Sequence, residues 1–230
     1  MSNDVKLSKE DIDTLKSLYQ INQTLRIVEN ETKIKSMNEA GNIAAITSLS
    51  VVFPVTINIY DLREFTNLIN IVDKPVLNFD NDSFITIKSE DGKQKLRYVK
   101  GSENLVTSYF EKVLRLPSEE IEIEIDGKKL KAVMEAALSL SLDYIGFKAN
   151  NGKIYFSAFK RNNGSGEDTN EFSIEVGETD KTYNMFYQKE RLKILNGDCK
   201  FVISAPSKIS RIQNDGTEFW ISLDAESVYN

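Results

Sequence analysis

The side chains of this 230-residue chain that could do chemistry are carboxylates, one thiol and a set of lysines. Histidine is absent, which excludes Ser-His and Cys-His nucleophiles, imidazole metal ligands and the usual general base near neutral pH. Cys199 is the one cysteine, so it has neither a disulfide partner in the chain nor a histidine to activate it. We therefore expect Cys199 to be a small buried residue of a strand.

Two groups of acidic residues resemble catalytic or metal sites. Four glutamates between residues 119 and 124 could supply the paired carboxylates of a glycosidase. Glu122 and Glu124 alternate with isoleucines, however, which predicts the solvated face of a strand. Asp-Asn-Asp at 80–82 begins like a calcium loop but lacks the later glycine and glutamate, which favours a hairpin turn. We expect no enzymatic activity, no cofactor and no metal ion.

Basic residues gather on the polar faces of predicted helices. Residues 1–110 carry 13 cations and 15 anions, and residues 111–230 carry 16 and 20, yet the two helices predicted in the second half are each +2. Cations on helices and anions elsewhere suit a protein that contacts DNA phosphates without reading bases. Such lysines can also serve only to solvate a helix, and that alternative stays open. The candidate DNA-binding residues are Lys9, Lys16, Lys128, Lys129, Lys131, Lys189, Arg191 and Lys193.

The elements that position these lysines follow from the hydropathy period, which switches between 2 and 3.6. Ser8 is expected to begin the first helix as a capping box, Asp61 and Asp126 to cap the second and third, and Gln188–Leu195 to form a short fourth. Each half then reads helix, strands, helix, three strands. The sequence predicts an α+β fold of two similar domains, residues 1–110 and 111–230, each with two helices packed on antiparallel sheet.

The chain has no segment that looks like a signal peptide or a membrane span. Its first residues are polar and acidic, and the longest apolar-rich run, 43–59, is interrupted by polar residues. The net charge of −6 argues against a protein that coats nucleic acid with its whole surface. We expect an intracellular, cytoplasmic protein.

Short motifs with a fixed order and spacing run along nearly the whole chain. They are Lys6-Leu7-Ser8-Lys9, Leu15-Lys16, Ile21-Asn22, Tyr60-Asp61-Leu62, Asp143-Tyr144-Ile145, Asn151-Gly152-Lys153-Ile154 and Asp224-Ala225-Glu226-Ser227. Together they resemble the DNA polymerase sliding clamps of large tailed bacteriophages, which are similar to proliferating cell nuclear antigen.

This resemblance implies the DNA-clamp fold and a homotrimeric ring whose twelve helices line a hole for duplex DNA. The implied partners are double-stranded DNA, the replicative DNA polymerase, an ATP-driven clamp loader and, in related phages, late transcription factors. Lys9 and Lys16 fall where the family has basic residues on the lining. The resemblance further implies that sheets join edge to edge between subunits, and we expect strands near Tyr109–Leu116 and Glu171–Val176 to meet there. Residues 138–141, Leu-Ser-Leu-Ser, depart from the basic residues of the family.

Two alternatives remain beside the clamp. The chain could be a non-enzymatic, two-domain, β-rich binding or virion structural protein, which would present strand aromatics such as Tyr155, Phe156 and Phe159 to solvent. It could also be a clamp-fold protein that no longer encircles DNA.

Overall fold

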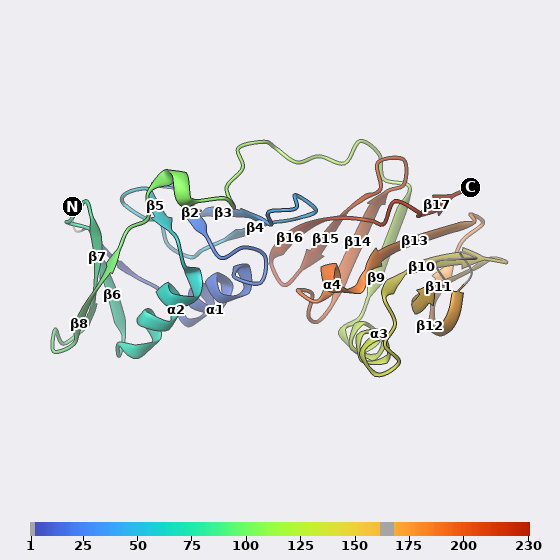
Figure 1. The fold of residues 1–230 in the computed structure, drawn as a ribbon, viewed down its shortest axis with the longest axis horizontal. Coiled ribbons are helices and arrows are strands. Elements are labelled where there is room, and N and C mark those ends of the chain that lie inside the picture. The colour runs from blue at the N-terminus through green and yellow to red at the C-terminus, as the bar shows by residue number, and fades with distance from the viewer. Residues whose placement is uncertain (1–2, 162–167) are drawn as a thin grey trace. The chain divides into compact units, whose positions relative to one another are not determined.

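The computed structural model describes residues 3–161 and 168–230. The chain divides into two compact units, Met1–Lys112 and Val113–Asn230 (Figure 1). Each unit combines helices with antiparallel sheet, so the predicted α+β class is confirmed. No helix among the described residues is both long and apolar enough to cross a bilayer.

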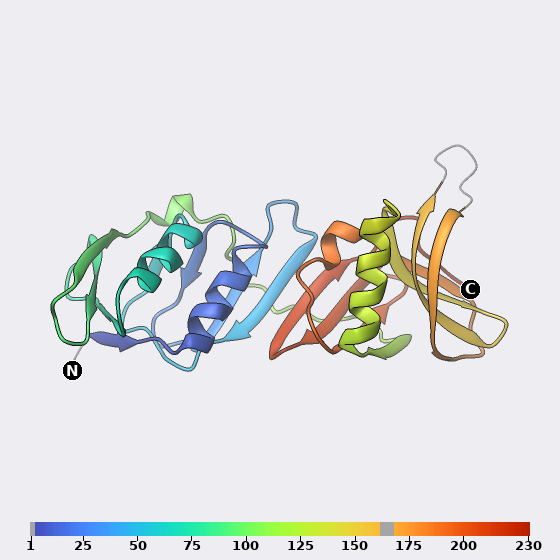
Figure 2. The same cartoon turned by 90° about the horizontal axis from the view of Figure 1, so that it is seen from below.

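Unit 1 contains helices α1 (Lys9–Leu18) and α2 (Leu62–Ile71), which lie side by side and in contact (Figure 2). Strands β1, β6, β7 and β8 form an antiparallel sheet in that order, while β2 pairs with β5 and β3 with β4. A 3-10 turn, Glu103–Leu105, follows the last strand. The strands are β1 (Asp4–Lys6), β2 (Leu25–Ile27), β3 (Lys33–Met37), β4 (Ile43–Ser48), β5 (Ile57–Ile59), β6 (Pro75–Asn78), β7 (Phe84–Ser89) and β8 (Lys95–Val99).

Unit 2 contains helix α3 (Gly127–Ser139) and the one-turn helix α4 (Lys189–Leu192). One of its sheets has the order β12-β11-β10-β13-β17, and β9-β14-β15-β16 are paired in a second. Helix α3 packs on β10, β11 and β12, and α4 packs on β13 and β10. The strands are β9 (Ile121–Ile125), β10 (Tyr144–Asn150), β11 (Lys153–Arg161), β12 (Asp168–Glu178), β13 (Tyr183–Gln188), β14 (Cys199–Ser204), β15 (Ile209–Asn214), β16 (Thr217–Ser222) and β17 (Val228–Tyr229).

Three helices begin where the sequence predicts. Ser8 accepts a hydrogen bond from the Asp11 N–H and donates its own N–H to the Asp11 carboxylate, which completes the capping box. Asp61 and Asp126 accept from the backbone N–H groups of Glu64 and Lys129. Each cap satisfies an N–H that has no partner within its helix, so the helix start is fixed locally.

Aromatic rings fill the core of unit 2. The Phe147 ring lies 5.0 Å from those of Phe156 and Phe201. Phe156 and Phe159 are fully buried, so they are not the solvent-exposed strand aromatics of the binding-protein alternative. Cys199 is also buried in β14, as predicted.

Two sequence expectations about elements are wrong. The fourth helix is only Lys189–Leu192 rather than Gln188–Leu195, because a tight turn from the Leu195 N–H to the Leu192 carbonyl ends it and Gln188 supplies no side-chain cap. Tyr109–Leu116 forms no strand. The Met37 N–H instead donates to the Ser108 carbonyl, which fastens the start of this segment to β3.

Candidate DNA-binding surfaces

Helix α1 carries two of the candidate lysines on its exposed face. Ile12, Leu15 and Leu18 are buried, and Lys9 and Lys16 are exposed on the opposite side. Lys16 Nζ lies 3.4 Å from Asp13 Oδ1, whereas Lys9 has no ion-pair partner among the described residues. The exposed pair contributes little to stability, so both ammonium groups remain available to a phosphate.

A buried carboxylate holds α1 against the segment after β4. Asp11 is 3% exposed and accepts hydrogen bonds from Ser50 as well as from Ser8. Burial by itself raises the pKa of Asp11, but the hydrogen bonds from Ser50 and Ser8 outweigh it and leave the pKa below its usual value. The carboxylate therefore stays ionised and sets which face of α1 is exposed.

Helix α3 presents the densest basic surface. Its buried face packs on the sheet, while Lys128 and Lys131 are exposed and Lys129 is half-buried. Lys131 Nζ lies 3.7 Å from Glu135, and Lys129 Nζ lies 3.1 Å from the cap residue Asp126. The backbone N–H of Lys129 lowers the pKa of Asp126 first, followed by its ammonium group. The helix keeps a net positive exposed face.

The three candidates around α4 differ in their surroundings. Arg191 Nη1 donates to the carbonyls of Ser222 (2.7 Å) and Leu223 (3.2 Å), so its guanidinium joins α4 to the end of β16. Lys193 is exposed and pairs with Glu190. Lys189 is half-buried and has no ion-pair partner within the described part of the chain. The charge spacing in the sequence could not reveal the contacts of Arg191, because they come from a distant strand.

Two helical surfaces lack lysine. After Arg63 and Glu64 in its first turn, the exposed side of α2 contains Asn67, Asn70 and Ile71, of which Ile71 is 67% exposed. Leu138 and Leu140, at the end of α3, are 59% and 51% exposed. The departure noted in residues 138–141 thus produces an exposed apolar end on this helix, and the basic surface is concentrated on α1 and the first turns of α3.

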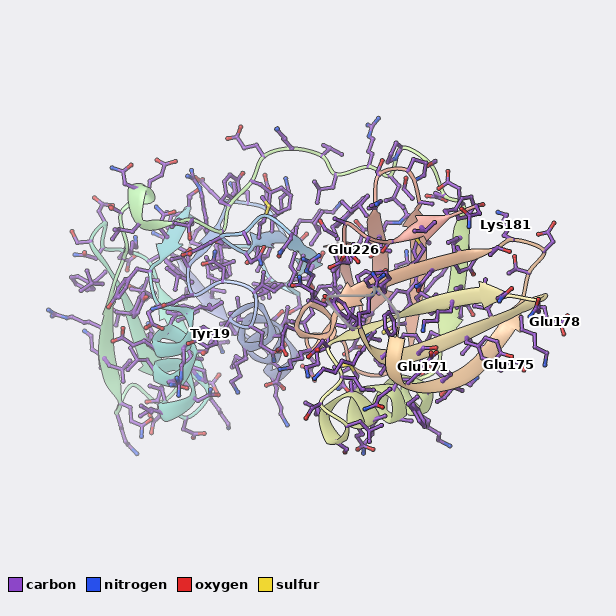
Figure 3. The ribbon with its side chains drawn as sticks, turned by 45° about the vertical axis from the view of Figure 1, so that its right-hand side comes forward. Tyr19, Glu171, Glu175, Glu178, Lys181 and Glu226 are labelled. Carbon is purple, nitrogen blue, oxygen red and sulfur yellow. The ribbon has the colours of Figure 1, made fainter. Side chains whose placement is uncertain are left out.

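The sheet edges carry opposite charges, which the sequence reasoning missed. Strand β8 ends the sheet of unit 1 and exposes Lys95 and Arg97. Strand β12 ends a sheet of unit 2, with Glu171, Glu175 and Glu178 following one another along it (Figure 3). In both strands, the alternation of charged and apolar residues in the sequence could have indicated these charged faces. Strand order, which makes them edges, depends on contacts far apart in the sequence.

Partly exposed apolar side chains lie on the other faces of these two strands, one on β8 and a row of three on β12. Leu96 of β8 and Phe172, Ile174 and Val176 of β12 are each only partly covered. The β12 glutamates are held in place by lysines of the same sheet, since Lys148 Nζ lies 2.8 Å from Glu171 and Lys153 Nζ 2.6 Å from Glu175. An edge with unpaired backbone groups and a partly exposed apolar row is a template for a further strand.

Comparison with known proteins reveals relatives along the whole chain. Residues 122–225 match the family model described as "gp45 sliding clamp, C terminal". The chain is 29% identical to the sliding clamp of Vibrio phage KVP40 over 226 residues, which covers 96% of this chain and all of the relative. It is 22% identical to the sliding clamp of Enterobacteria phage T4, covering 98% of this chain and all of that one.

Solved structures share the fold at lower identity. The proliferating cell nuclear antigen of Entamoeba histolytica superposes with a TM-score of 0.70 at 10% identity, covering 97% of this chain and all of the other. The Helicobacter pylori β clamp bound to a DNA ligase peptide superposes with a TM-score of 0.68 at 12% identity, covering 98% of this chain and 66% of the other. The chain therefore has the DNA-clamp fold.

Proposed function

This chain is a relative of the sliding clamps of tailed bacteriophages, and we propose that it encircles duplex DNA as a homotrimeric ring and tethers the replicative polymerase. The observation that carries the proposal is the similarity to phage clamps from one end of the chain to the other. The lysines of α1 and α3 would face the DNA and hold it by its phosphates.

Ring closure would use the two charged edges. A β8 strand of one subunit would pair with β12 of the next, which would bring Lys95 and Arg97 near Glu171 and Glu175 and extend the partly exposed apolar surface across the joint. These strands replace Tyr109–Leu116 in the expected interface, because that segment has no strand. The other expected segment, Glu171–Val176, lies within β12 and stays in the proposed interface. Pairing of β8 with β12 at each joint would cover both of these edges in a closed ring.

The lysines would hold DNA loosely. An exposed ammonium facing a phosphate across water gives a weak interaction, screened over about 8 Å at physiological salt. Contacts of similar strength at every position along the duplex leave low barriers to sliding. Processivity would then arise from the closed ring rather than from affinity. Lys9, Lys16, Lys128, Lys129 and Lys131 fit this role best. Lys189 and Lys193 are further candidates, while Arg191 stabilises the fold through its hydrogen bonds to Ser222 and Leu223.

The remaining partners follow from the family. A polymerase, an ATP-driven clamp loader and late transcription factors would bind the ring in the cytoplasm of the infected host. The chain itself would act without catalysis, as a processivity factor. The Helicobacter pylori β clamp, which shares the fold, binds a peptide of a DNA ligase, and partners of this chain would dock through short segments in the same way.

Native mass as a function of concentration tests ring assembly. We expect a particle of three chains, each of 26.1 kDa, which dissociates to single chains as the protein is diluted. A particle with the mass of one chain at every accessible concentration contradicts the homotrimer.

A further inference from the structure

A polar network runs across one sheet of unit 2 and ends on its edge strand β12. Lys148 lies on β10, and in the strand order β12-β11-β10 a whole strand separates it from Glu171 of β12. The Lys148 Nζ nevertheless lies 2.8 Å from Glu171 Oε2. Glu171 is one of the glutamates that follow one another along β12 (Figure 3). A lysine from inside the sheet therefore reaches a carboxylate on its edge.

Both carboxylate oxygens of Glu171 are engaged within the sheet. Lys148 donates to Oε2, and the Ser173 hydroxyl donates to Oε1 at 2.6 Å. Ser157 of β11 lies opposite Ser173, and because the Ser173 proton goes to Glu171, the Ser157 hydroxyl donates to Ser173 at 2.9 Å. These donors fix the rotamer of Glu171, while each oxygen keeps a lone pair for a further donor.

The lysine is fixed as well. Its ammonium group lies 4.1 Å from the centre of the Phe159 ring, which is fully buried. The side chain of Lys148 is only 19% exposed, against 35% for Glu171. Cation–π attraction adds to the ion pair and holds the ammonium group over the ring. Lys148 and Glu171 thus keep one arrangement before any other surface approaches.

The carboxylate stays ionised in this position. Burial alone would raise the pKa of Glu171, but the hydrogen bonds from Lys148 and Ser173 outweigh burial and leave the pKa below its usual value. Glu171 is therefore an anion at neutral pH. A cation that approached the free edge of β12 would extend an alternating row of charge, with Lys148 on one side of Glu171 and the new cation on the other.

A second ion pair between β11 and β12 is far less fixed. Lys153 Nζ lies 2.6 Å from Glu175 Oε2, but the two side chains are 48% and 46% exposed. Exposed pairs contribute little, since solvent screens them and both long side chains lose freedom. This pair has the same chemistry without the burial, so it is the matched control for Lys148 and Glu171.

We propose that Lys148 is a positioning residue of the subunit joint, which holds the Glu171 carboxylate where Lys95 and Arg97 of the next subunit meet it. The inference rests on the proposed ring and on pairing of β8 with β12. An ion pair between exposed side chains gains little when both must be ordered on contact. Here one member is ordered in advance, so less side-chain freedom is lost when two subunits associate.

Native mass over a range of concentrations measures this effect. Lys148→Met keeps an unbranched side chain and removes the ammonium group, and we expect it to raise the concentration at which half of the chains form rings by about tenfold or more. Lys148→Arg, which keeps the charge, should restore assembly to within about threefold of the unmodified protein. The control Lys153→Met should also stay within about threefold.

A double-mutant cycle separates positioning from a general effect on the strand. Lys148→Met is also measured in a chain with Lys95→Gln and Arg97→Gln, whose β8 can still pair through its backbone. If Lys148 acts through Glu171 on these cations, its removal should change assembly by less than about threefold in that background. Equal weakening in both backgrounds would mean that Lys148 only stabilises β12, and would overturn the proposal.

Ser173→Ala keeps the test decisive if Lys148→Met does not fold. It removes the second donor to Glu171 while leaving Lys148 in place, and it should weaken assembly only where Lys95 and Arg97 are present. Assembly that Lys148→Met leaves unchanged or strengthens also overturns the proposal, and strengthening would mean that Lys148 competes with the next subunit for Glu171. An unmodified protein with the mass of one chain at every concentration contradicts the ring itself, whereas a ring that is insensitive to Lys148 contradicts this inference alone.

Discussion

The carboxylate of Asp11 accepts hydrogen bonds from both the backbone N–H and the hydroxyl of Ser50, each 2.6 Å long. This contact joins the first turn of α1 to a residue 39 positions later in the chain. The same carboxylate closes the capping box with Ser8. One buried side chain therefore both starts α1 and fixes the face on which Lys9 and Lys16 lie.

Replacing Asp11 should destabilise unit 1. Asp11→Asn substitutes an amide for one of the acceptor oxygens and leaves a donor of Ser50 or Ser8 unpaired, at a cost of about 1–3 kcal/mol. Thermal or denaturant unfolding measures this change. The matched control is Asp13→Asn, whose side chain is exposed and pairs only with Lys16 at 3.4 Å, and it should change stability by a few tenths of a kcal/mol at most.

The pH dependence of stability should carry the signature of Asp11. Because its folded-state pKa is lowered, its contribution is fully present above the unfolded-state value of about 3.9 and is lost as the pH falls through the folded-state pKa. We expect the stability of Asp11→Asn to fall less steeply below pH 4 than that of the unmodified protein. Parallel acid profiles would show that Asp11 does not supply the effect.

Reversing the charge at one lysine of α1 and one of α3 should weaken DNA loading without affecting assembly. Lys16→Glu combined with Lys131→Glu places two anions on the exposed faces of α1 and α3, which removes phosphate contacts and flattens the salt dependence of DNA binding by about one unit of slope per lost contact. Native mass should remain that of the ring. Lys33→Glu, an exposed lysine of β3, is the control. Loading that the double variant leaves unchanged would remove both residues from the lining.

Charge reversal on β8 should break the ring, and a compensating reversal should restore it. Lys95→Glu with Arg97→Glu would place four carboxylates along the proposed joint, and native mass should shift toward single chains. Adding Glu171→Lys and Glu175→Lys to the same chain should recover assembly in part. The attraction across the joint returns with its sign exchanged, but the ion pairs with Lys148 and Lys153 are lost.

A linker pair provides the control for this edge. Lys112→Glu with Arg115→Glu makes the same change of charge at exposed residues outside the strands, and it should leave the mass unaltered. Equal effects of the linker and edge variants would mean that net charge, rather than β8, governs assembly.

The buried thiol should be inert in the folded protein. Burial, with a smaller effect of Asp198, raises the pKa of Cys199 to about 12. At pH 8 only a small fraction of the thiol is ionised, and the sulfur is buried away from reagents in solution. We therefore expect an aromatic disulfide reagent to react at least about a hundredfold more slowly than with the unfolded chain. Reaction at the rate of a free thiol under native conditions would contradict the burial of β14.

The features predicted correctly from sequence are those set by neighbours in the chain. Ser8, Asp61 and Asp126 cap helices as expected, since a cap needs only the next three residues. Cys199 is buried, as expected for a small residue beside the apolar run Phe201–Ile203 of its strand. The motif order also gave the clamp fold, because it spans the whole chain.

What could not be predicted depends on contacts between distant segments. Arg191 donates to carbonyls at the end of β16, which the +2 charge of its helix does not indicate. The edges β8 and β12 exist only through strand order, so the linker segment Tyr109–Leu116 was mistaken for an edge strand.

Topological retention on DNA tests the central claim most directly. The protein is loaded by its cognate loader onto nicked circular duplex, excess protein is removed at a salt concentration that abolishes simple binding, and the circle is then cut at one site. We predict that the protein stays on the intact circle and leaves after linearisation, and that it remains if both ends of the linear DNA are blocked. Retention that is the same before and after the cut contradicts the ring.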